Sequence, residues 1–130
     1  MIRFRGYRTG QTGGGCLVTV VDEAGDQVVL PLSPIIRGRE VRHSPDGFQW
    51  GYSGSGPTEL ARAILVRLYP DDDRVRHPRC YRHFRDFAIS RVKSDEFELK
   101  EDVARSWYEQ WLASPEQQGD FKVERGWLES

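Results

Sequence analysis

The chain has 130 residues, of which 38% are hydrophobic, 12% aromatic and 30% charged. This length predicts a single domain, and the aromatic content is not typical of a disordered chain. A mean hydropathy of −0.64 and the lack of a long apolar run argue against a membrane span, and residues 1–5 do not resemble a secretory signal. Cys16 and Cys80 lie far apart and suggest no disulfide framework, so we expect a reduced, cytoplasmic protein with no membrane partner.

The net charge of −1 conceals two segments of opposite sign. Residues 58–94 hold nine basic and five acidic side chains, a balance of +4, whereas residues 95–130 hold four basic and ten acidic ones, a balance of −6. We favour the interpretation that the two segments pack near each other and neutralise. The alternative is that each segment forms a surface for a different partner.

Four segments in the first half of the chain have the patterns of β-strands. Residues 2–8 alternate between apolar and polar side chains, which is the period of a half-buried strand. Residues 16–21 and 27–32, which are rich in β-branched side chains and lie on either side of a short turn, predict a hairpin. Residues 47–52 predict a further strand, which would carry on one face the aromatic side chains of Phe48, Trp50 and Tyr52.

The second half of the chain predicts three helices. The first begins with Pro57 as its first residue and ends before Pro70; Arg62 and Arg67 are expected to face away from its apolar stripe, which comprises Leu60, Ala61, Ile64, Leu65 and Leu68. The second begins at Pro78, with Arg82, Arg85 and Arg91 opposite an apolar face made by Tyr81, Phe84, Ala88 and Val92. The third covers about residues 101–113 and is expected to bury Val103, Ala104, Trp107, Tyr108 and Trp111.

Strands followed by helices predict an α+β fold. A small antiparallel sheet, made of the N-terminal strand, the hairpin and the aromatic strand, would be covered on one face by about three helices. Residues 1–113 would form this single domain, and residues 114–130 an acidic C-terminal extension that packs on it or trails from it.

The loop before the first predicted helix is the most informative candidate for a ligand site. Its glycines can adopt positive φ, and a helix N-terminus, where backbone N–H groups are free, favours an anion. No lysine follows the loop, and no serine has the G-x-S-x-G context, so neither a P-loop nor a nucleophile elbow is indicated. A purely structural turn is the favoured interpretation; the candidate ligand residues are Trp50, Tyr52, Ser53, Gly54, Ser55 and Gly56.

A second group of reactive side chains comprises His77, Cys80 and His83. Their spacing suits two ligands of one metal ion but not three on one helix face, so we predict no metal site and no cofactor. Nearby arginines would in principle lower the pKa of Cys80, but no third group is present to orient a Cys–His pair. We therefore predict no catalytic residues. Trp107, Tyr108 and Trp111 share a helix face, for which core packing is favoured over an exposed binding surface.

The segment from Gly47 to Pro57, with the core Phe-Gln-Trp-Gly-Tyr-Ser-Gly-Ser-Gly-Pro, continues through Leu60-Ala61 and Ala63-Ile64-Leu65. On these residues the sequence resembles a family of small uncharacterised proteins of bacteria, archaea and their viruses or integrated elements, over most of residues 3–113. The resemblance implies a second helix that contains aromatic residues, followed by a short strand that leads into a Trp-containing helix. It also implies a genomic setting, but it implies no enzymatic reaction. Lys100 departs from the Thr or Ser cap expected at that last helix.

These observations favour a non-enzymatic protein of a phage or mobile element that binds a host protein or a protein–nucleic acid complex. The most concrete version is an inhibitor of a host defence complex such as a CRISPR effector. An acidic segment of this chain would bind the basic grooves of that complex in place of nucleic acid. The acidic residues of this segment are Asp95, Glu96, Glu98, Glu101, Asp102 and Glu109, with Glu116 beyond them. The alternatives are a nucleotide or other small ligand at the Gly-Ser loop, or nucleic acid bound by the basic middle of the chain through Arg79, Arg82, Arg85 and Arg91.

Overall fold

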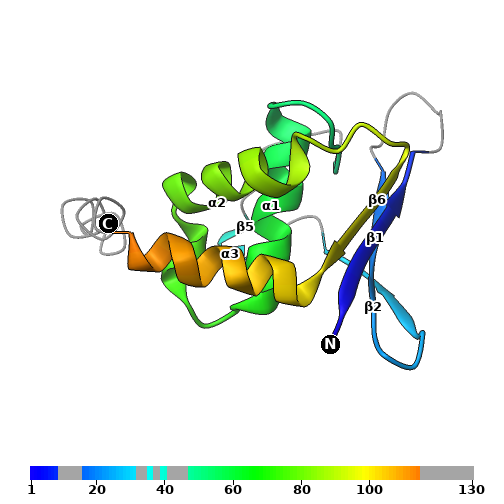
Figure 1. Cartoon of the computed structure of the whole chain (residues 1–130), viewed down its shortest axis with the longest axis horizontal. Coiled ribbons are helices and arrows are strands. Elements are labelled where there is room, and N and C mark those ends of the chain that lie inside the picture. Colours follow the sequence, from blue (N-terminus) through cyan, green and yellow to red (C-terminus); the bar gives the residue numbers. More distant parts are fainter. Residues whose placement is uncertain (9–15, 32–34, 37–38, 41–46, 115–130) are drawn as a thin grey trace.

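The computed structural model describes residues 1–8, 16–31, 35–36, 39–40 and 47–114, and the fold is α+β (Figure 1). The segment 9–15, the histidine at position 43 and the predicted extension beyond Ser114, with Glu116, lie outside the described residues.

A four-stranded antiparallel sheet forms one layer of the molecule. Its strands are β1 (Arg3–Tyr7), β2 (Leu17–Val21), β3 (Gln27–Val29) and β6 (Glu96–Lys100), in the order β3-β2-β1-β6. β1 is therefore central, paired with the hairpin on one side and with β6 on the other. Two shorter strands, β4 (Ile35–Ile36) and β5 (Arg39–Glu40), pair with each other outside this sheet.

The aromatic segment 47–52 is not a strand of this sheet, contrary to the sequence prediction. It makes a single β-bridge, between Phe48 and Cys16, and the chain then turns away at Gly51, whose φ is +92°. The position beside β1 is occupied instead by β6, the short strand that the family resemblance implies before the last helix. Alternation of Phe97 and Leu99, both buried, with charged residues gives β6 the period of a half-buried strand.

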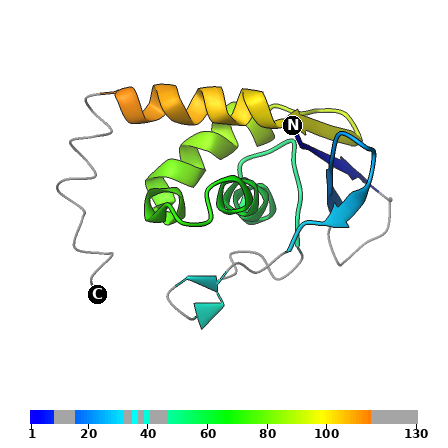
Figure 2. The ribbon, with the colours of Figure 1, turned by 90° about the horizontal axis from the view of Figure 1, so that it is seen from below.

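Helices form the second layer and lie on one side of the sheet (Figures 1 and 2). They are α1 (Ser55–Leu68), the 3₁₀ turn η1 (Asp73–Arg76), α2 (Pro78–Phe84), the π-helical turn η2 (Arg85–Ile89) that continues it, and α3 (Glu101–Ala113). The predicted bounds of α3 and the predicted start of α2 are confirmed, whereas α1 begins two residues before Pro57. None of the described helices combines the length and the apolar character that crossing a bilayer requires.

The core lies between the two layers. Phe4, Val18 and Phe97 point from the sheet toward the helices, which contribute Leu60, Ile64, Leu65 and Phe84; all are buried. Two predicted orientations are wrong. Val103 is 42% exposed rather than buried. Arg62 is fully buried rather than facing solvent.

Arg62 is buried because it has an ionic partner within its own helix. Its Nη2 lies 2.8 Å from Oε1 of Glu59, which is also fully buried, and its guanidinium lies 5.7 Å from the centre of the Tyr81 ring. Residues three apart are neighbours on a helix, so the two charges are buried together. Removal of either one would break this buried pair, a change that typically costs about 3–5 kcal/mol.

Candidate anion-binding site

The Gly-Ser loop and the basic middle of the chain, two separate candidates in the sequence, meet at one pocket. This pocket has a volume of about 390 Å³ and is lined by Gly54 and Ser55 from the loop, Thr58 from the first turn of α1, and Arg82 and Arg85 from α2 and η2. Of the four arginines predicted to bind nucleic acid, the pocket takes in these two and neither Arg79 nor Arg91.

The loop is held in place by its contacts with the end of η2. Gly51 donates its N–H to the carbonyl of Ile89 (3.1 Å), and its own carbonyl accepts from Nζ of Lys93 (2.9 Å). The Ser53 hydroxyl lies within hydrogen-bond distance of the Ser90 hydroxyl (3.2 Å). The positive φ that we expected of this loop occurs at Gly51 and not at Gly54, whose φ is −150°.

The start of α1, where Gly54, Ser55 and Thr58 line the pocket, has backbone N–H groups without an intrahelical acceptor. Gly54 occupies the N-cap position, no side chain caps the helix there, and the first turn contains no acidic residue. The first intrahelical bond runs from the N–H of Thr58 to the carbonyl of Gly54 (3.0 Å). The N–H groups of Ser55 and Gly56 precede it, so they belong to the set that a helix cannot satisfy internally. The helix dipole adds partial positive charge at the same place.

Arg85 is fixed in the wall of the pocket by a chain of hydrogen bonds. Its Nη1 donates to the hydroxyl of Thr58 (2.9 Å), which in turn donates to the carbonyl of Gly54 (2.7 Å). Its Nε donates to the carboxylate of Asp86 (2.9 Å), and no described residue accepts a hydrogen bond from its Nη2. Arg82 is exposed at the rim and forms no ion pair with any described residue. The pocket lining thus holds two cations, one of which is paired with Asp86, a residue outside the lining.

The two aromatic residues among the candidate ligand residues, Trp50 and Tyr52, differ in their exposure. Trp50 is fully buried: its ring packs on Phe97, with 5.5 Å between ring centres, and its Nε1 donates to the carbonyl of Ser94 (2.9 Å). It therefore belongs to the core and is not available to a ligand. Tyr52 is half-exposed, and its ring lies beside Gly54, which lines the pocket, although Tyr52 is not itself a lining residue.

The profile of a family of unknown function, DUF6166, matches residues 4–110. The chain belongs to this family. No curated protein and no solved structure matches the chain. Membership of DUF6166 confirms the resemblance to an uncharacterised family and adds no activity to the geometry of the pocket.

The His77, Cys80 and His83 group of this DUF6166 protein does not form a common site. Nδ1 of His77 accepts from the backbone N–H of Arg79 as the cap of α2, and Nδ1 of His83 accepts from Nε1 of Trp111 (3.1 Å). Cys80 is fully buried, and this burial raises the pKa of its thiol far above the usual range, the opposite of the lowering considered from the sequence. Within the described residues no three potential metal ligands cluster.

In its described part, the acidic segment of the DUF6166 chain is partly neutralised by arginines that lie outside the basic middle. Asp95 pairs with Arg8 and Glu98 with Arg3, both on or beside β1, each at 3.5 Å. Glu101 accepts from Arg105 (2.6 Å) and from the N–H of Ile2 (2.9 Å). The other three predicted acids form no ion pair with a described residue and are exposed; they are Glu96, Asp102 and Glu109.

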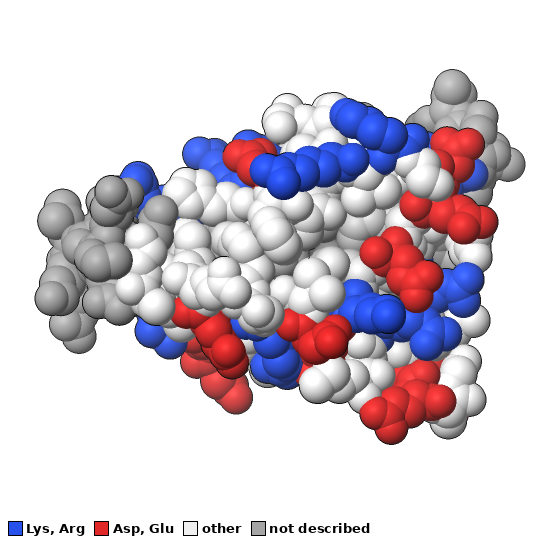
Figure 3. Space-filling model, viewed as in Figure 1, with Lys and Arg blue, Asp and Glu red and all other residues white. Residues whose placement is uncertain are grey.

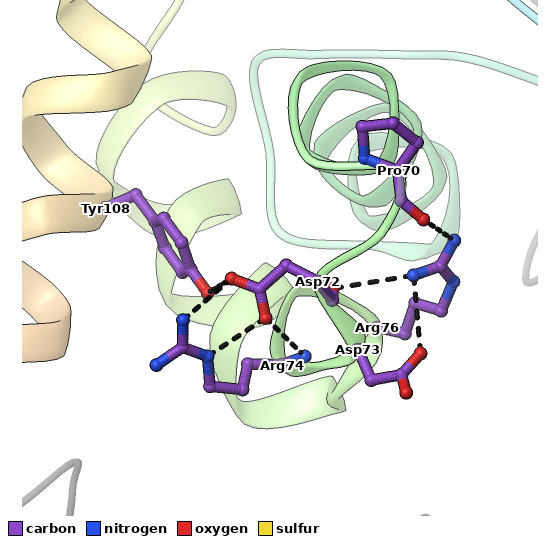
Figure 4. A network of polar contacts seen from close by, with 6 residues as sticks. All are labelled: Pro70, Asp72, Asp73, Arg74, Arg76 and Tyr108. Atoms are coloured by element: carbon purple, nitrogen blue, oxygen red, sulfur yellow. Dashed lines mark hydrogen bonds and ion pairs between the residues drawn. The ribbon is translucent and has the colours of Figure 1, made fainter.

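A second polar cluster lies in the segment that connects the end of α1 to η1 (Figure 4). The Asp72 carboxylate caps η1, accepts two side-chain hydrogen bonds from Arg74 (2.9 Å each), and accepts the hydroxyl of Tyr108 on α3 (2.7 Å). Arg76 donates to the carbonyl of Pro70 and pairs with Asp73. An open hollow of about 640 Å³ is lined by residues 68–74. Because Asp72 and Arg74 satisfy each other, this cluster is structural; of this region, the sequence predicts only that the first helix ends before Pro70.

Proposed function

We propose that the protein binds a phosphate-bearing small ligand of nucleotide size in the pocket at the start of α1. The observation that carries the proposal is the convergence of Arg82, Arg85 and the uncapped N-terminus of α1 on one cavity. Guanidinium groups bind phosphate through parallel hydrogen bonds, and helix N-termini add backbone donors. A volume of about 390 Å³ is within the range of small-molecule sites.

Tyr52 gives the proposed ligand a second point of contact. Its half-exposed ring beside Gly54 offers a face on which a nucleobase can stack while the phosphate lies between the arginines. A nucleoside monophosphate therefore matches the pocket better than inorganic phosphate does.

Calorimetric titration with nucleoside monophosphates and with inorganic phosphate tests the proposal. Arg82→Ala should weaken binding by about tenfold or more, since a charge-assisted hydrogen bond contributes about 1.5–3 kcal/mol, and Tyr52→Ala should weaken the nucleotide but not inorganic phosphate. The matched control is Arg67→Ala, which removes an exposed arginine in the last turn of α1, at the opposite end of that helix from the pocket. Equal effects of Arg67→Ala and Arg82→Ala, or no binding of any phosphate compound, would contradict the proposal.

The salt dependence of binding separates this proposal from the nucleic-acid alternative. One phosphate in one pocket gives a shallow dependence on salt, whereas an oligonucleotide that contacts several arginines gives a steep one. Tight binding of a single-stranded oligonucleotide with a steep slope, lost on Arg91→Ala, would favour the alternative.

Inhibition of a host defence complex by a phage or mobile-element protein stays a prediction. The pairing of Asp95, Glu98 and Glu101 narrows the acids that could mimic a phosphate backbone to Glu96, Asp102 and Glu109. If these acids mimic a phosphate backbone, reversing the charge of all three residues should abolish binding to such a complex. Unchanged binding would exclude the mimicry.

A further inference from the structure

The strand β3 is an exposed edge of the sheet. It stands at one end of the strand order β3-β2-β1-β6, and in both ribbon views it lies at the rim of the molecule, with no described helix beyond it (Figures 1 and 2). Val28 pairs with the buried Val20 and shares its face of the sheet, yet Val28 is 69% exposed, so the helices do not cover it. Its neighbours are exposed as well. We refer to Gln27, Val28 and Val29 as the β3 edge.

The hydrogen bonds of the hairpin fix which backbone groups of the β3 edge point outward. Leu30 donates its N–H to the carbonyl of Val18 on β2 (2.9 Å). Bonded and non-bonded pairs alternate along an antiparallel ladder, so Val28 also bonds to β2, whereas Gln27 and Val29 point their N–H and C=O groups away from it. Among the described residues, none forms a hydrogen bond with these outward groups.

The opposite edge of the same sheet differs in its charge. β6 carries Glu96, Glu98 and Lys100, all exposed, and Figure 3 shows charged side chains of both signs over β6 and β1. Charged side chains are a common means of preventing an edge strand from pairing with another chain. The β3 edge contains no charged residue, no proline and no bulge, so it lacks this protection. It offers a neighbouring strand both apolar side chains and unpaired backbone groups.

We infer that a second copy of this chain pairs with the β3 edge in antiparallel orientation, about a two-fold axis at Val28. This register places Val28 opposite its own copy and Gln27 opposite Val29 of the other chain, so every outward N–H and C=O group of both strands gains a partner. Asp26, which precedes the strand, lies opposite the uncharged Leu30 of the other chain, so the register brings no like charges together. The two four-stranded sheets thereby join into one continuous sheet.

Disulfide trapping tests the register. In the proposed pair the Cα atoms of the two copies of residue 28 lie about 4.5 Å apart, within the range of a disulfide. Val28→Cys should therefore cross-link two chains when oxidised glutathione is added, and the wild type should not, because Cys16 and Cys80 are buried. Val29→Cys is the matched control: its two copies are diagonal neighbours, roughly 7–8 Å apart, and should cross-link on the order of tenfold more slowly.

Sedimentation velocity over a wide range of protein concentration tests the backbone pairing. Val29→Pro removes an outward N–H from each strand but no bond to β2, and proline is tolerated where the N–H of an edge strand faces solvent. It should raise the dissociation constant of the dimer about tenfold or more, whereas Val29→Thr, which keeps the N–H, should change it by less than about threefold. Circular dichroism verifies that both variants are folded. A wild-type chain that is monomeric at every concentration, equal cross-linking at positions 28 and 29, or equal dimerisation of the proline and threonine variants would overturn the inference.

Discussion

Gly51 is the residue at which the turn before α1 depends most on the lack of a side chain. Its φ of +92° is strained for any other residue, and a Cβ there would lie 2.8 Å from the carbonyl oxygen of Val92 and 2.7 Å from the Arg8 guanidinium. Gly54, three residues later, has an extended φ, and a Cβ there would meet only the half-exposed ring of Tyr52. The two glycines of one motif therefore have different roles.

We predict that Gly51→Ala lowers the free energy of unfolding by about 1–3 kcal/mol, the usual cost of a strained backbone conformation. Gly54→Ala should change it by less than about 0.5 kcal/mol, as expected of a surface substitution, because the Tyr52 ring can move into solvent. Urea denaturation of the two variants measures both values. Similar losses at the two positions would mean that the loop glycines are required for close packing rather than for positive φ.

At the scale of the elements, the sequence predicted the helices better than it predicted the sheet. Local patterns suffice for a helix: Pro78 begins α2, and the bounds of α3 are those expected. A strand depends on a distant partner, so the aromatic segment could not be recognised as a turn that buries Trp50 under β1 and β6. The alternation in β6 was present in the sequence, but only the family resemblance implied a strand there, and its glutamates were interpreted as part of a charged segment.

The candidate site was predicted only in part, because it too depends on contacts between segments that are distant in the sequence. The loop and the arginines were each identified, but only the packing of α2 and η2 against α1 brings Arg82 and Arg85 to Ser55. Thr58 was missed, although its place in the first helical turn could have suggested it. The burial of Arg62 could have been suggested by Glu59, three residues before it, within an otherwise apolar helix face.

The start of α3 lacks a residue whose side chain can cap the helix. Lys100 occupies the N-cap position with φ −82° and ψ 145°, and its side chain accepts no hydrogen bond from the helix. Lys100→Ser should raise the free energy of unfolding by about 0.5–2 kcal/mol, because a serine oxygen can accept an N–H of the first turn in this backbone conformation. Lys100→Ala is the control and should give no gain. Chemical denaturation of both variants distinguishes a capping effect from removal of the lysine charge.

In the molecule as a whole, α3 is joined to the rest of the helical layer by a polar contact as well as by its aromatic face. Tyr108 is buried, packs on Tyr69 with 4.6 Å between ring centres, and donates to Asp72 at the start of η1. The same carboxylate is bound by Arg74, so one side chain joins η1 to α3. Partial burial by itself would raise the pKa of Asp72, but the hydrogen bonds from Arg74 and Tyr108 outweigh it and lower the pKa below 3.8.

This lowered pKa predicts how the stability of the whole molecule responds to acid. A carboxylate whose pKa is lower in the folded than in the unfolded state contributes stability that is fully present above the unfolded value, near 3.8, and is lost as the pH falls through the folded value. Asp72→Asn should therefore lower the free energy of unfolding by about 1–3 kcal/mol at neutral pH, and its difference from the wild type should shrink below about pH 4.

Urea denaturation of both proteins at a series of pH values measures this difference. Glu101 has a lowered pKa as well, chiefly through the N–H of Ile2, but it is present in both proteins, so its contribution cancels from the comparison. Tyr108→Phe, which keeps the charge on Asp72 and removes one of its donors, should give a smaller loss with the same dependence on pH. A deficit of Asp72→Asn that stays constant down to strongly acidic pH would show that Asp72 acts through its shape and not through its charge.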